Sequence, residues 1–341
     1  MEKQLPHFDV ERSFQPHRLL RGGHIQTLAG NCLPGRYYDS SAVVHRVEFP
    51  DGDVVALHDD CPPGWKDADQ SAFLVHGLAG TSQSSYMRRV AGKLAARGVR
   101  VFRMDLRGCG AGSGLARMPY HPGRSQDALW AIRYAADLCP QSPLAFVGFS
   151  LGANLGLKML GEFRNQLPPN LKRAIAINPP LDLEQSTYAL ERFFTQIYNA
   201  RFVKCLLRQV ELSPKLIRRT ALLKFGKRLR KIREFDDYYT RAVWGFASVS
   251  EFYADGSAAS WLDQIAVPTL ILASKDDPIV PCGIFQNTPR SPQVTLHLTE
   301  TGGHMGFVGR RGVDADRRWM EWRVVDWVTA EEPRASLSHA A

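Results

Sequence analysis

Residues 70–180 alternate between short apolar segments and longer amphipathic segments, and this alternation constrains the fold more than any other feature of the sequence. Strands and helices that alternate in this way favour a parallel sheet covered by helices on both faces. The expected strands are Ala72–Val75, Val99–Met104, Leu144–Val147 and Ala174–Ile177, and the expected helices are Ser84–Arg97, Arg124–Leu138 and Ala153–Phe163. In such sheets the active site lies at the carboxyl ends of the strands.

A serine follows the third of these strands, within the stretch Gly148-Phe-Ser-Leu-Gly152. The pattern G-x-S-x-G between a strand and a helix is typical of a nucleophile elbow, a sharp turn that exposes the serine hydroxyl. A Cβ at either glycine would collide with the neighbouring strand or helix. We therefore predict that Ser150 is a nucleophile. The alternatives are that Ser150 is an ordinary turn residue, or that Ser82 takes this role, although the loop Gly77–Ser85 is too long for an elbow.

A serine hydroxyl needs a base within hydrogen-bond reach, and the base needs a carboxylate that orients it. In this type of sheet the acid and then the histidine follow the serine along the chain. Asp277 comes after an expected strand at Thr269–Ala273, and His304 comes after another at Val294–Leu298. We predict that they are the acid and the base. The alternatives are Asp276 as the acid and His297, which lies inside the last strand, as the base.

The tetrahedral intermediate of acyl transfer needs two N–H donors. We expect them to be the backbone amides of Leu151, directly after the serine, and Leu78, in the loop after Ala72–Val75. Candidate pocket residues are His76, Tyr120, His121, Phe193, Phe194, Tyr198 and Phe202. A structural histidine is the alternative for His121. Asp105 and Arg107 are expected to order the glycine-rich loop that follows them, which matches neither the dinucleotide-binding nor the P-loop pattern.

The rest of the chain divides into an N-terminal arm and an interrupted core. Residues 1–40 read as an irregular arm, and residues 41–180 as the first part of the core, with further strands at Val43–Phe49 and Val54–His58. Residues 181–260 read as a helical cap, and residues 261–330 as the second part of the core, closed by a helix at Asp314–Val328. We expect residues 331–341 to be a disordered tail.

The net charge of +9 is concentrated in the predicted cap. Residues 201–233 hold twelve Lys and Arg and one acid, Glu211, so this segment carries +11 and the remainder −2. A nucleic-acid-binding function would rest on this segment alone, and we do not expect one. The charge is expected either to form a solvated face or to contact anionic lipid head groups. Two apolar stripes predict amphipathic helices in the cap: Leu190, Phe193, Phe194, Ile197, Tyr198; and Phe202, Val203, Leu206, Leu207, Val210.

The composition is that of a globular protein, with 44% hydrophobic and 23% charged residues. No apolar run reaches the roughly 18 residues of a membrane span, and no signal-peptide pattern begins the chain, so we expect a cytoplasmic protein, with peripheral membrane contact through the cap as a further hypothesis. The six cysteines form no C-x-x-C pair, which indicates free thiols and neither a zinc nor a redox motif.

An ordered set of motifs resembles the YheT-like α/β-hydrolases, the AB hydrolase 4 family. These motifs are Gly23-His-Ile-Gln-Thr27, His76-Gly-Leu-Ala-Gly80, Arg107-Gly-Cys-Gly110, Tyr120-His121, Gly148-Phe-Ser-Leu-Gly152, Phe235-Asp236, Asp276-Asp-Pro278 and Gly303-His-Met-Gly306. The resemblance covers roughly residues 15–330. It implies an α/β-hydrolase fold with a mostly parallel eight-stranded sheet, helices on both faces and a helical cap. It also implies serine carboxylesterase or lipase-like activity, with Ser150, Asp277 and His304 as the triad.

Together these observations predict a serine hydrolase that cleaves carboxylic esters, either of short- to medium-chain acyl groups or of lipids, without a metal or an organic cofactor. The apolar and aromatic cap favours an acyl chain as the bound group. An acyltransferase that uses the same triad and a non-catalytic lipid- or ligand-binding module on this fold are the alternatives. The stretch Gly23–Thr27 has no chemical role in this scheme, and we expect it to tie the N-terminal arm to the sheet.

Overall fold

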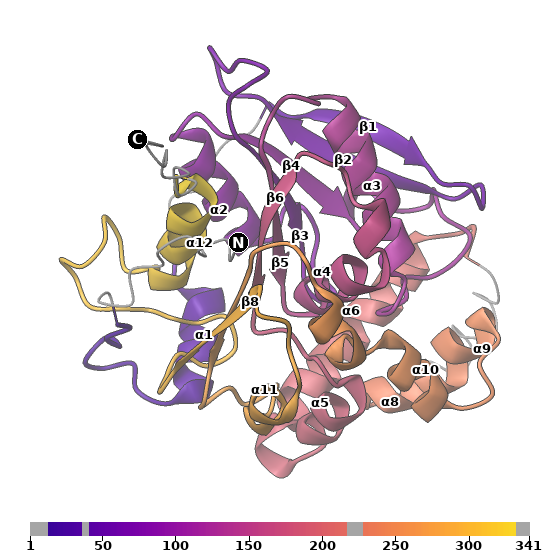
Figure 1. Cartoon of the computed structure of the whole chain (residues 1–341). Coiled ribbons are helices and arrows are strands. Elements are labelled where there is room, and N and C mark those ends of the chain that lie inside the picture. The colour runs from indigo at the N-terminus through magenta and orange to yellow at the C-terminus, as the bar shows by residue number, and fades with distance from the viewer. Residues whose placement is uncertain (1–12, 36–40, 217–227, 332–341) are drawn as a thin grey trace.

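The computed structural model describes residues 13–35, 41–216 and 228–331, and its centre is an eight-stranded sheet (Figure 1). The strand order is β1-β2-β4-β3-β5-β6-β7-β8. The strands are β1 (Val43–Glu48), β2 (Val54–Asp60), β3 (Ser71–Val75), β4 (Arg100–Asp105), β5 (Leu144–Phe149), β6 (Leu171–Ile177), β7 (Thr269–Ser274) and β8 (Val294–Thr299). β1 and β2 pair in antiparallel fashion, β2 also runs antiparallel to β4, and all other pairs are parallel. The predicted fold class is confirmed.

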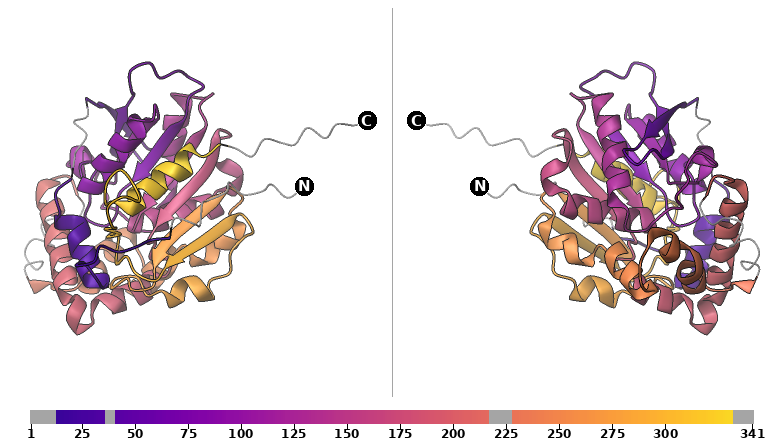
Figure 2. Two further views of the ribbon diagram at one scale, coloured as in Figure 1. Left: turned by 90° about the vertical axis from the view of Figure 1, so that its left-hand side faces the viewer. Right: turned by 90° about the vertical axis from the view of Figure 1, so that its right-hand side faces the viewer.

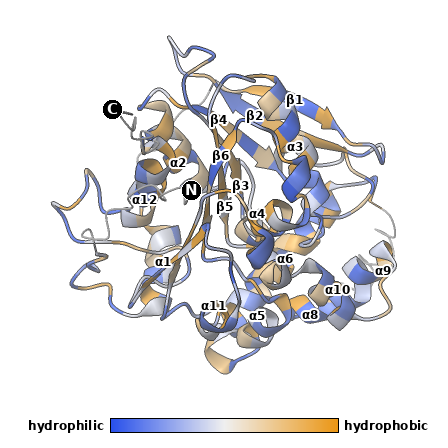
Figure 3. Cartoon of the chain, in the orientation of Figure 1, coloured by the Kyte–Doolittle hydropathy of each residue, from blue (hydrophilic) through white to orange (hydrophobic). Residues whose placement is uncertain are grey.

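Helices cover both faces of this sheet, because successive side chains of each strand point to opposite sides. Ala72 and Leu74 of β3 pack into one core with helices α2 (Ser85–Ala95) and α12 (Trp319–Thr329). Phe73 and Val75 pack into the other core with α3 (Ser125–Asp137) and α4 (Leu151–Glu162). The two strands at the centre of the sheet, β3 and β5, are buried along their whole length, which explains their apolar sequences; they carry the hydrophobic colours in Figure 3.

The predicted strands and core helices agree with the structure to within a few residues, with two exceptions. The closing helix α12 begins at Trp319 and not at Asp314, because residues 311–317 form turns and bends. The N-terminal arm is not irregular throughout, since Gly23–Cys32 forms helix α1. Figure 2 shows α1 beside both the C-terminal part of the core and the cap helices. The predicted disordered tail lies outside the described residues, apart from Glu331.

The chain between β6 and β7, residues 181–260, is called the cap below, and it gathers at one end of the sheet (Figure 1). Its described segments are α5 (Leu183–Leu190), the short helix η3 (Phe193–Thr195), α6 (Gln196–Leu212), α8 (Ile232–Phe235), the π-helix η5 (Asp236–Thr240), α9 (Arg241–Trp244) and α10 (Val249–Gly256). The 3₁₀ segment η6 (Ala259–Gln264) leads from the cap back towards β7. A last short helix, α11 (Gly283–Asn287), follows β7. No helix in the described part of the chain is long and apolar enough to cross a membrane.

The second predicted stripe of the cap is confirmed and the first is wrong. Val203, Leu206 and Val210 are buried along α6, as expected for an amphipathic helix. The residues from Leu190 to Tyr198 do not share one helix, because α5 ends at Leu190 and α6 begins only at Gln196. Their apolar spacing therefore spans a junction between helices, and it does not define one buried face.

Candidate active site

Ser150 lies at the turn between β5 and α4, in the strained conformation that an elbow requires. Its φ is 50° and its ψ is −118°, and its N–H donates to Ile177 O on β6 at 2.8 Å. The two flanking glycines are needed for the reason predicted. A Cβ at Gly148 would lie 2.5 Å from Cα of Ala153, and one at Gly152 would lie 2.5 Å from the carbonyl oxygen of Val75.

The structure brings the predicted acid and base to Ser150. Nε2 of His304 lies 2.8 Å from the Ser150 hydroxyl, and Nδ1 of His304 lies 2.8 Å from Oδ2 of Asp277. The side chains of His304 and Asp277 are 8% and 0% exposed. A serine, a histidine and a carboxylate in this chain of contacts allow proton transfer from the hydroxyl to the imidazole, with the carboxylate holding the ring.

Asp277, and not its neighbour Asp276, contacts His304, because the backbone around Asp277 turns its carboxylate inward. Oδ1 accepts from the N–H groups of Ile279 and Val280 at 2.8 and 3.0 Å. Oδ2 accepts from Nδ2 of Asn178 at 2.8 Å, in addition to its contact with the imidazole. Asp276 instead accepts from the Gly303 N–H at 2.8 Å. The other rival, His297, stays in β8, with its ring 6.1 Å from that of Trp319.

The loop after β3 approaches Ser150 closely enough to supply an N–H donor. A Cβ at Gly77 would lie 3.0 Å from Cβ of Ser150. Leu78 and Leu151 line the same pocket as Ser150. Within the described part of the chain, neither residue's N–H donates a hydrogen bond. Two backbone N–H groups that are free to donate, close to a serine hydroxyl, suit the binding of an oxyanion.

Helix α1 holds the loop that carries His304, which gives a physical meaning to the stretch Gly23–Thr27. Oγ1 of Thr27 accepts from the His304 N–H at 2.8 Å and donates to Gly23 O at 2.7 Å. Gln26 accepts from Val308 N–H at 2.7 Å and donates to Val308 O at 3.2 Å. The stretch Gly23–Thr27 thus ties the arm to the histidine loop, where we had expected a tie to the sheet itself.

Glycines allow this helix to lie directly against the loop. A Cβ at Gly23 would lie 1.7 Å from Asp276 O, and one at Gly303 would lie 2.2 Å from Gly23 O. Likewise, a Cβ at Gly30 would lie 2.7 Å from Cα of Gly306. Backbone packs on backbone here, which only glycine permits.

Backbone strain is concentrated in the loops that meet at Ser150. Among the described residues, five non-glycine residues have positive φ: Ala79, Ser150, Asn178, Met305 and Phe307. Ala79 belongs to the loop after β3, Asn178 follows β6, and the last two follow His304. Non-glycine residues in this region each cost about 1–3 kcal/mol and cluster at functional sites.

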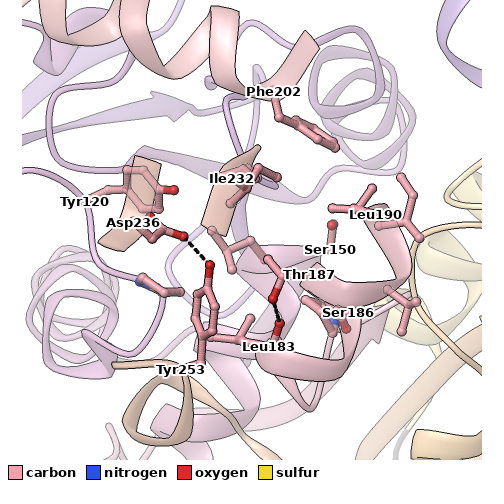
Figure 4. Close-up of a pocket in the computed structure, with 16 residues that line it drawn as sticks. Tyr120, Ser150, Leu183, Ser186, Thr187, Leu190, Phe202, Ile232, Asp236 and Tyr253 are labelled. Carbon is pink, nitrogen blue, oxygen red and sulfur yellow. Dashed lines mark hydrogen bonds between the residues drawn. The ribbon is translucent and has the colours of Figure 1, made fainter. Parts of the chain in front are cut away.

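The pocket at Ser150 is lined mainly by the core loops and the cap (Figure 4). Its lining residues are Leu78, Tyr120, Pro122, Ser150, Leu151, Pro180, Leu183, Ser186, Thr187, Leu190, Phe202, Ile232, Asp236, Tyr253, Ile279 and Val280. Of the predicted pocket residues, Tyr120 and Phe202 are therefore in place. Most of the lining is apolar, as expected for a site that holds an acyl chain.

His76 and His121 are not among the residues that line this pocket. His76 is fully buried; its Nδ1 contacts Gly77 O at 2.8 Å, and its Nε2 accepts from the Leu106 N–H at 3.2 Å. Burial lowers the pKa of His76. His121 packs at 4.6 Å from the ring of Phe252, and burial, together with nearby Arg124, lowers its pKa to about 3. Both rings are held as structural groups.

Three predicted aromatic pocket residues of the cap also lie elsewhere. Phe193 and Phe194 are 81% and 77% exposed, because the short helix η3 projects them outward. Tyr198 is buried against α1, where its hydroxyl lies 3.1 Å from Nδ1 of His24 and the two rings stack. The prediction failed because all three residues were assigned to one helix.

Asp105 and Arg107 hold the glycine-rich loop by hydrogen bonds and ion pairs, as expected. Asp105 accepts from the Ser82 and Ala111 N–H groups at 2.6 and 2.9 Å. The buried guanidinium of Arg107 pairs with Asp127 and Asp53, each at 2.6 Å. Ser82 is thereby bound to Asp105 and is fully buried.

Several residues that the structure places at the site were not among the predicted site residues. Thr27 and Asn178 hold the histidine loop and Asp277, and Asp236 and Tyr253 line the pocket. Two signals were present: Gly23–Thr27 and Phe235-Asp236 both belong to the motif set. Their roles depend on contacts between segments far apart in the chain, which no local pattern encodes.

The chain matches a family model described as the alpha/beta hydrolase fold over residues 73–310. It is 33% identical to YheT of Escherichia coli, a protein named as an esterase candidate, over 94% of each chain. It is 28% identical to a Saccharomyces cerevisiae monoacylglycerol lipase, over 74% of this chain and 57% of the relative. It is 26% identical to human phospholipase ABHD3, over 69% of this chain and 58% of the relative.

Solved structures share the fold at lower identity. An esterase from Pyrococcus furiosus superposes with a TM-score of 0.55 at 16% identity, over 88% of this chain and 98% of the esterase. A 2,6-dihydroxy-pseudo-oxynicotine hydrolase superposes with a TM-score of 0.57 at 18% identity, over 91% of this chain and 73% of the hydrolase.

Proposed function

This chain belongs to the YheT-like α/β-hydrolases, and on that premise we propose that it is a serine hydrolase of carboxylic esters in which Ser150, His304 and Asp277 form the catalytic triad. The observation that carries the proposal is the unbroken contact chain, with 2.8 Å from Ser150 to His304 and 2.8 Å from His304 to Asp277, at the wall of an apolar pocket. Relatives named as esterase, lipase and phospholipase support the same class of reaction.

In the first half-reaction Ser150 Oγ attacks the ester carbonyl carbon, and Nε2 of His304 takes the hydroxyl proton. The carbonyl oxygen becomes an oxyanion, which accepts from the N–H groups of Leu78 and Leu151. Asp277 accepts from Nδ1–H and stabilises the imidazolium. His304 then gives its proton to the leaving alkoxide as the C–O bond breaks, which leaves an acyl-serine.

In the second half-reaction a water molecule takes the place of the alcohol. His304 removes its proton while the water oxygen attacks the acyl-serine, and the second oxyanion is held by the same two amides. The imidazolium returns the proton to Ser150 Oγ as the acid leaves. Leu190, Phe202 and Ile232 offer an apolar surface to the acyl chain.

The proposal is tested by hydrolysis of p-nitrophenyl esters of increasing chain length. We expect turnover by the wild type, with kcat/KM rising from acetate to medium chains as more apolar surface is buried. The Ser150→Ala variant should lose hydrolysis of all these esters. Ser186→Ala, a second serine in the same pocket, is the matched control and should remain active. An equal loss of hydrolysis in both variants would show that Ser150 has no special role as the nucleophile.

We also propose that the cap contacts anionic membranes through its exposed aromatic edge. Phe193, Phe194 and Ile197 are 81%, 77% and 73% exposed. Arg192 precedes them, and Arg201 is exposed on the following helix. Exposed aromatic and aliphatic side chains flanked by basic residues suit insertion at the interface of an anionic bilayer.

Vesicle sedimentation tests this contact. The wild type should bind vesicles that contain phosphatidylglycerol more strongly than pure phosphatidylcholine vesicles. A Phe193→Ser/Phe194→Ser variant should lose most of this binding. Leu138→Ser, which removes an exposed apolar residue at the end of α3, should keep it. Binding that is unchanged in the double variant would contradict the role of the cap edge.

A further inference from the structure

The pocket at Ser150 has two chemically different sides. Leu190 and Phe202 lie on the side nearest Ser150 in Figure 4. Asp236, Tyr120 and Tyr253 gather on the opposite side. A group of polar side chains that is set apart from the reacting serine has no task in the proposed triad mechanism.

Asp236 is the unusual member of this group. It is 3% exposed and begins the π-helix η5. Oδ2 accepts from the Tyr253 hydroxyl and Oδ1 from the Thr240 hydroxyl, both at 2.9 Å. Among the described residues no Lys, Arg or His forms an ion pair with it. A carboxyl group is costly to bury without a cation, and π-helical turns are frequent at functional sites.

The carboxyl group has hydrogen-bonding capacity left for a ligand. Each carboxylate oxygen has two lone pairs, and the structure gives each oxygen of Asp236 one hydroxyl partner. Burial raises the pKa of Asp236 to about 7. Near neutral pH the group can therefore accept from a ligand hydroxyl as the carboxylate or donate to it as the acid. A cationic ligand, in contrast, would require Asp236 to be ionised.

We propose that Asp236, with Tyr120 and Tyr253, forms a subsite that binds a hydroxyl group of the ester substrate. The preferred substrates are then hydroxylated esters, and simple alkyl esters are poor ones. This inference rests on the proposed ester hydrolysis. The hydroxyl can belong to the alcohol part or to the acyl part, and the chemistry of recognition is the same in both.

Paired esters test the subsite. Monobutyrin against propyl butyrate probes a hydroxyl on the alcohol part, and methyl 6-hydroxyhexanoate against methyl hexanoate probes one on the acyl part. Butyrylcholine against 3,3-dimethylbutyl butyrate, its uncharged isostere, probes a cation. We expect the wild type to favour the hydroxylated member of at least one of the first two pairs by about tenfold in kcat/KM, the value of roughly one hydrogen bond.

Asp236→Leu should reduce that preference about tenfold, as the loss of one hydrogen bond predicts. Asp237→Leu is the matched control, because Asp237 is the next residue but is exposed and paired with Arg241 at 2.8 Å. The control should keep the wild-type preference. Since the wild-type comparison needs no variant, the inference stays testable even if Asp236→Leu fails to fold.

Three results would overturn the subsite: equal kcat/KM for both members of every pair in the wild type, a preference for the choline ester alone, or a hydroxyl preference that survives in Asp236→Leu. These differ from failure of the proposed function, in which the wild type would hydrolyse no ester in the panel. If the wild type hydrolyses the alkyl esters as well as the hydroxylated ones, the subsite is contradicted and the proposed ester hydrolysis is not.

Discussion

Two aspartates with buried side chains, Asp277 at the end of the sheet and Asp236 in the cap, have surroundings of different kinds. Asp277 accepts from two backbone N–H groups, one amide side chain and the imidazole of His304. Asp236 accepts from two hydroxyls. The first set fixes an anion in one orientation. The second tolerates either protonation state, because a hydroxyl can donate or accept.

The difference extends to the regions around them. At the sheet end, the strained loops after β3, β5, β6 and β8 meet, with close glycine contacts, and α1 holds the histidine loop from outside. In the cap, short helices and a π-helix present apolar side chains both to the pocket and to the surface. We infer that the sheet end provides the chemistry and the cap selects the substrate.

The largest expected effect separates Asp277 from its neighbour. Asp277→Asn should lower kcat by about a thousandfold or more, because the amide cannot stabilise the imidazolium and favours the wrong tautomer. Asp276→Asn is the matched control and should cost about tenfold or less, since its amide oxygen can still accept from Gly303 N–H. Comparable losses in both variants, measured on one ester, would contradict the assignment of Asp277.

A second effect concerns the contribution of Asp236 to the stability of the protein. Burial raises the pKa of Asp236 from 3.8 to about 7, so between these values the folded protein holds a proton that the unfolded chain has released. The contribution of Asp236 to stability is therefore complete at low pH and is lost as pH rises towards 7. Asp236→Asn carries no such dependence. Relative to wild type, its unfolding free energy should rise by about 3 kcal/mol from pH 5 to pH 8.

Urea unfolding at both pH values measures this difference. Asp237→Asn, which changes an exposed carboxylate one residue away, should show little pH dependence relative to wild type. A stability difference for Asp236→Asn that is the same at pH 5 and pH 8 would mean that Asp236 is ionised in the folded protein throughout this range. Such a result would remove its ability to act as a hydrogen-bond donor.

The smallest effect tests whether α1 positions the base. Thr27→Val removes the acceptor for the His304 N–H, and we expect kcat to fall about tenfold with little change in KM. Thr27→Ser keeps the hydroxyl and should restore kcat. A merely structural role would lower the folded fraction and leave kcat per folded enzyme unchanged, so the fraction is measured by thermal unfolding. Equal kcat in all three proteins would exclude positioning through Thr27.

Local sequence patterns were sufficient for the core. The buried strands could be predicted because apolar runs of four to six residues between glycine-rich loops permit few alternatives. The elbow at Gly148-Phe-Ser-Leu-Gly152 could be predicted because the turn leaves no room for a Cβ at either glycine. The order of acid and histidine after the serine then indicated Asp277 and His304, and the structure brings both to Ser150.

The same patterns failed where contacts across the chain decide the structure. Helix α1 contains Gly23 and Gly30, which lower helix propensity, yet they are required for its packing against the histidine loop. In the cap, apolar spacing continued across the break between α5 and α6, so Phe193 and Phe194 were wrongly placed in the pocket. Asp236 stood in a motif without an assigned role, because its burial and its hydrogen bond from Tyr253 depend on contacts between distant segments.

The central claim is that His304 makes Ser150 the nucleophile. Its most direct test is reaction with a fluorophosphonate, followed by mass spectrometry that locates the adduct on the chain. We predict one adduct, on Ser150, that disappears in Ser150→Ala and forms far more slowly in His304→Gln. An adduct on another serine such as Ser186, or labelling at the wild-type rate in His304→Gln, would contradict the account.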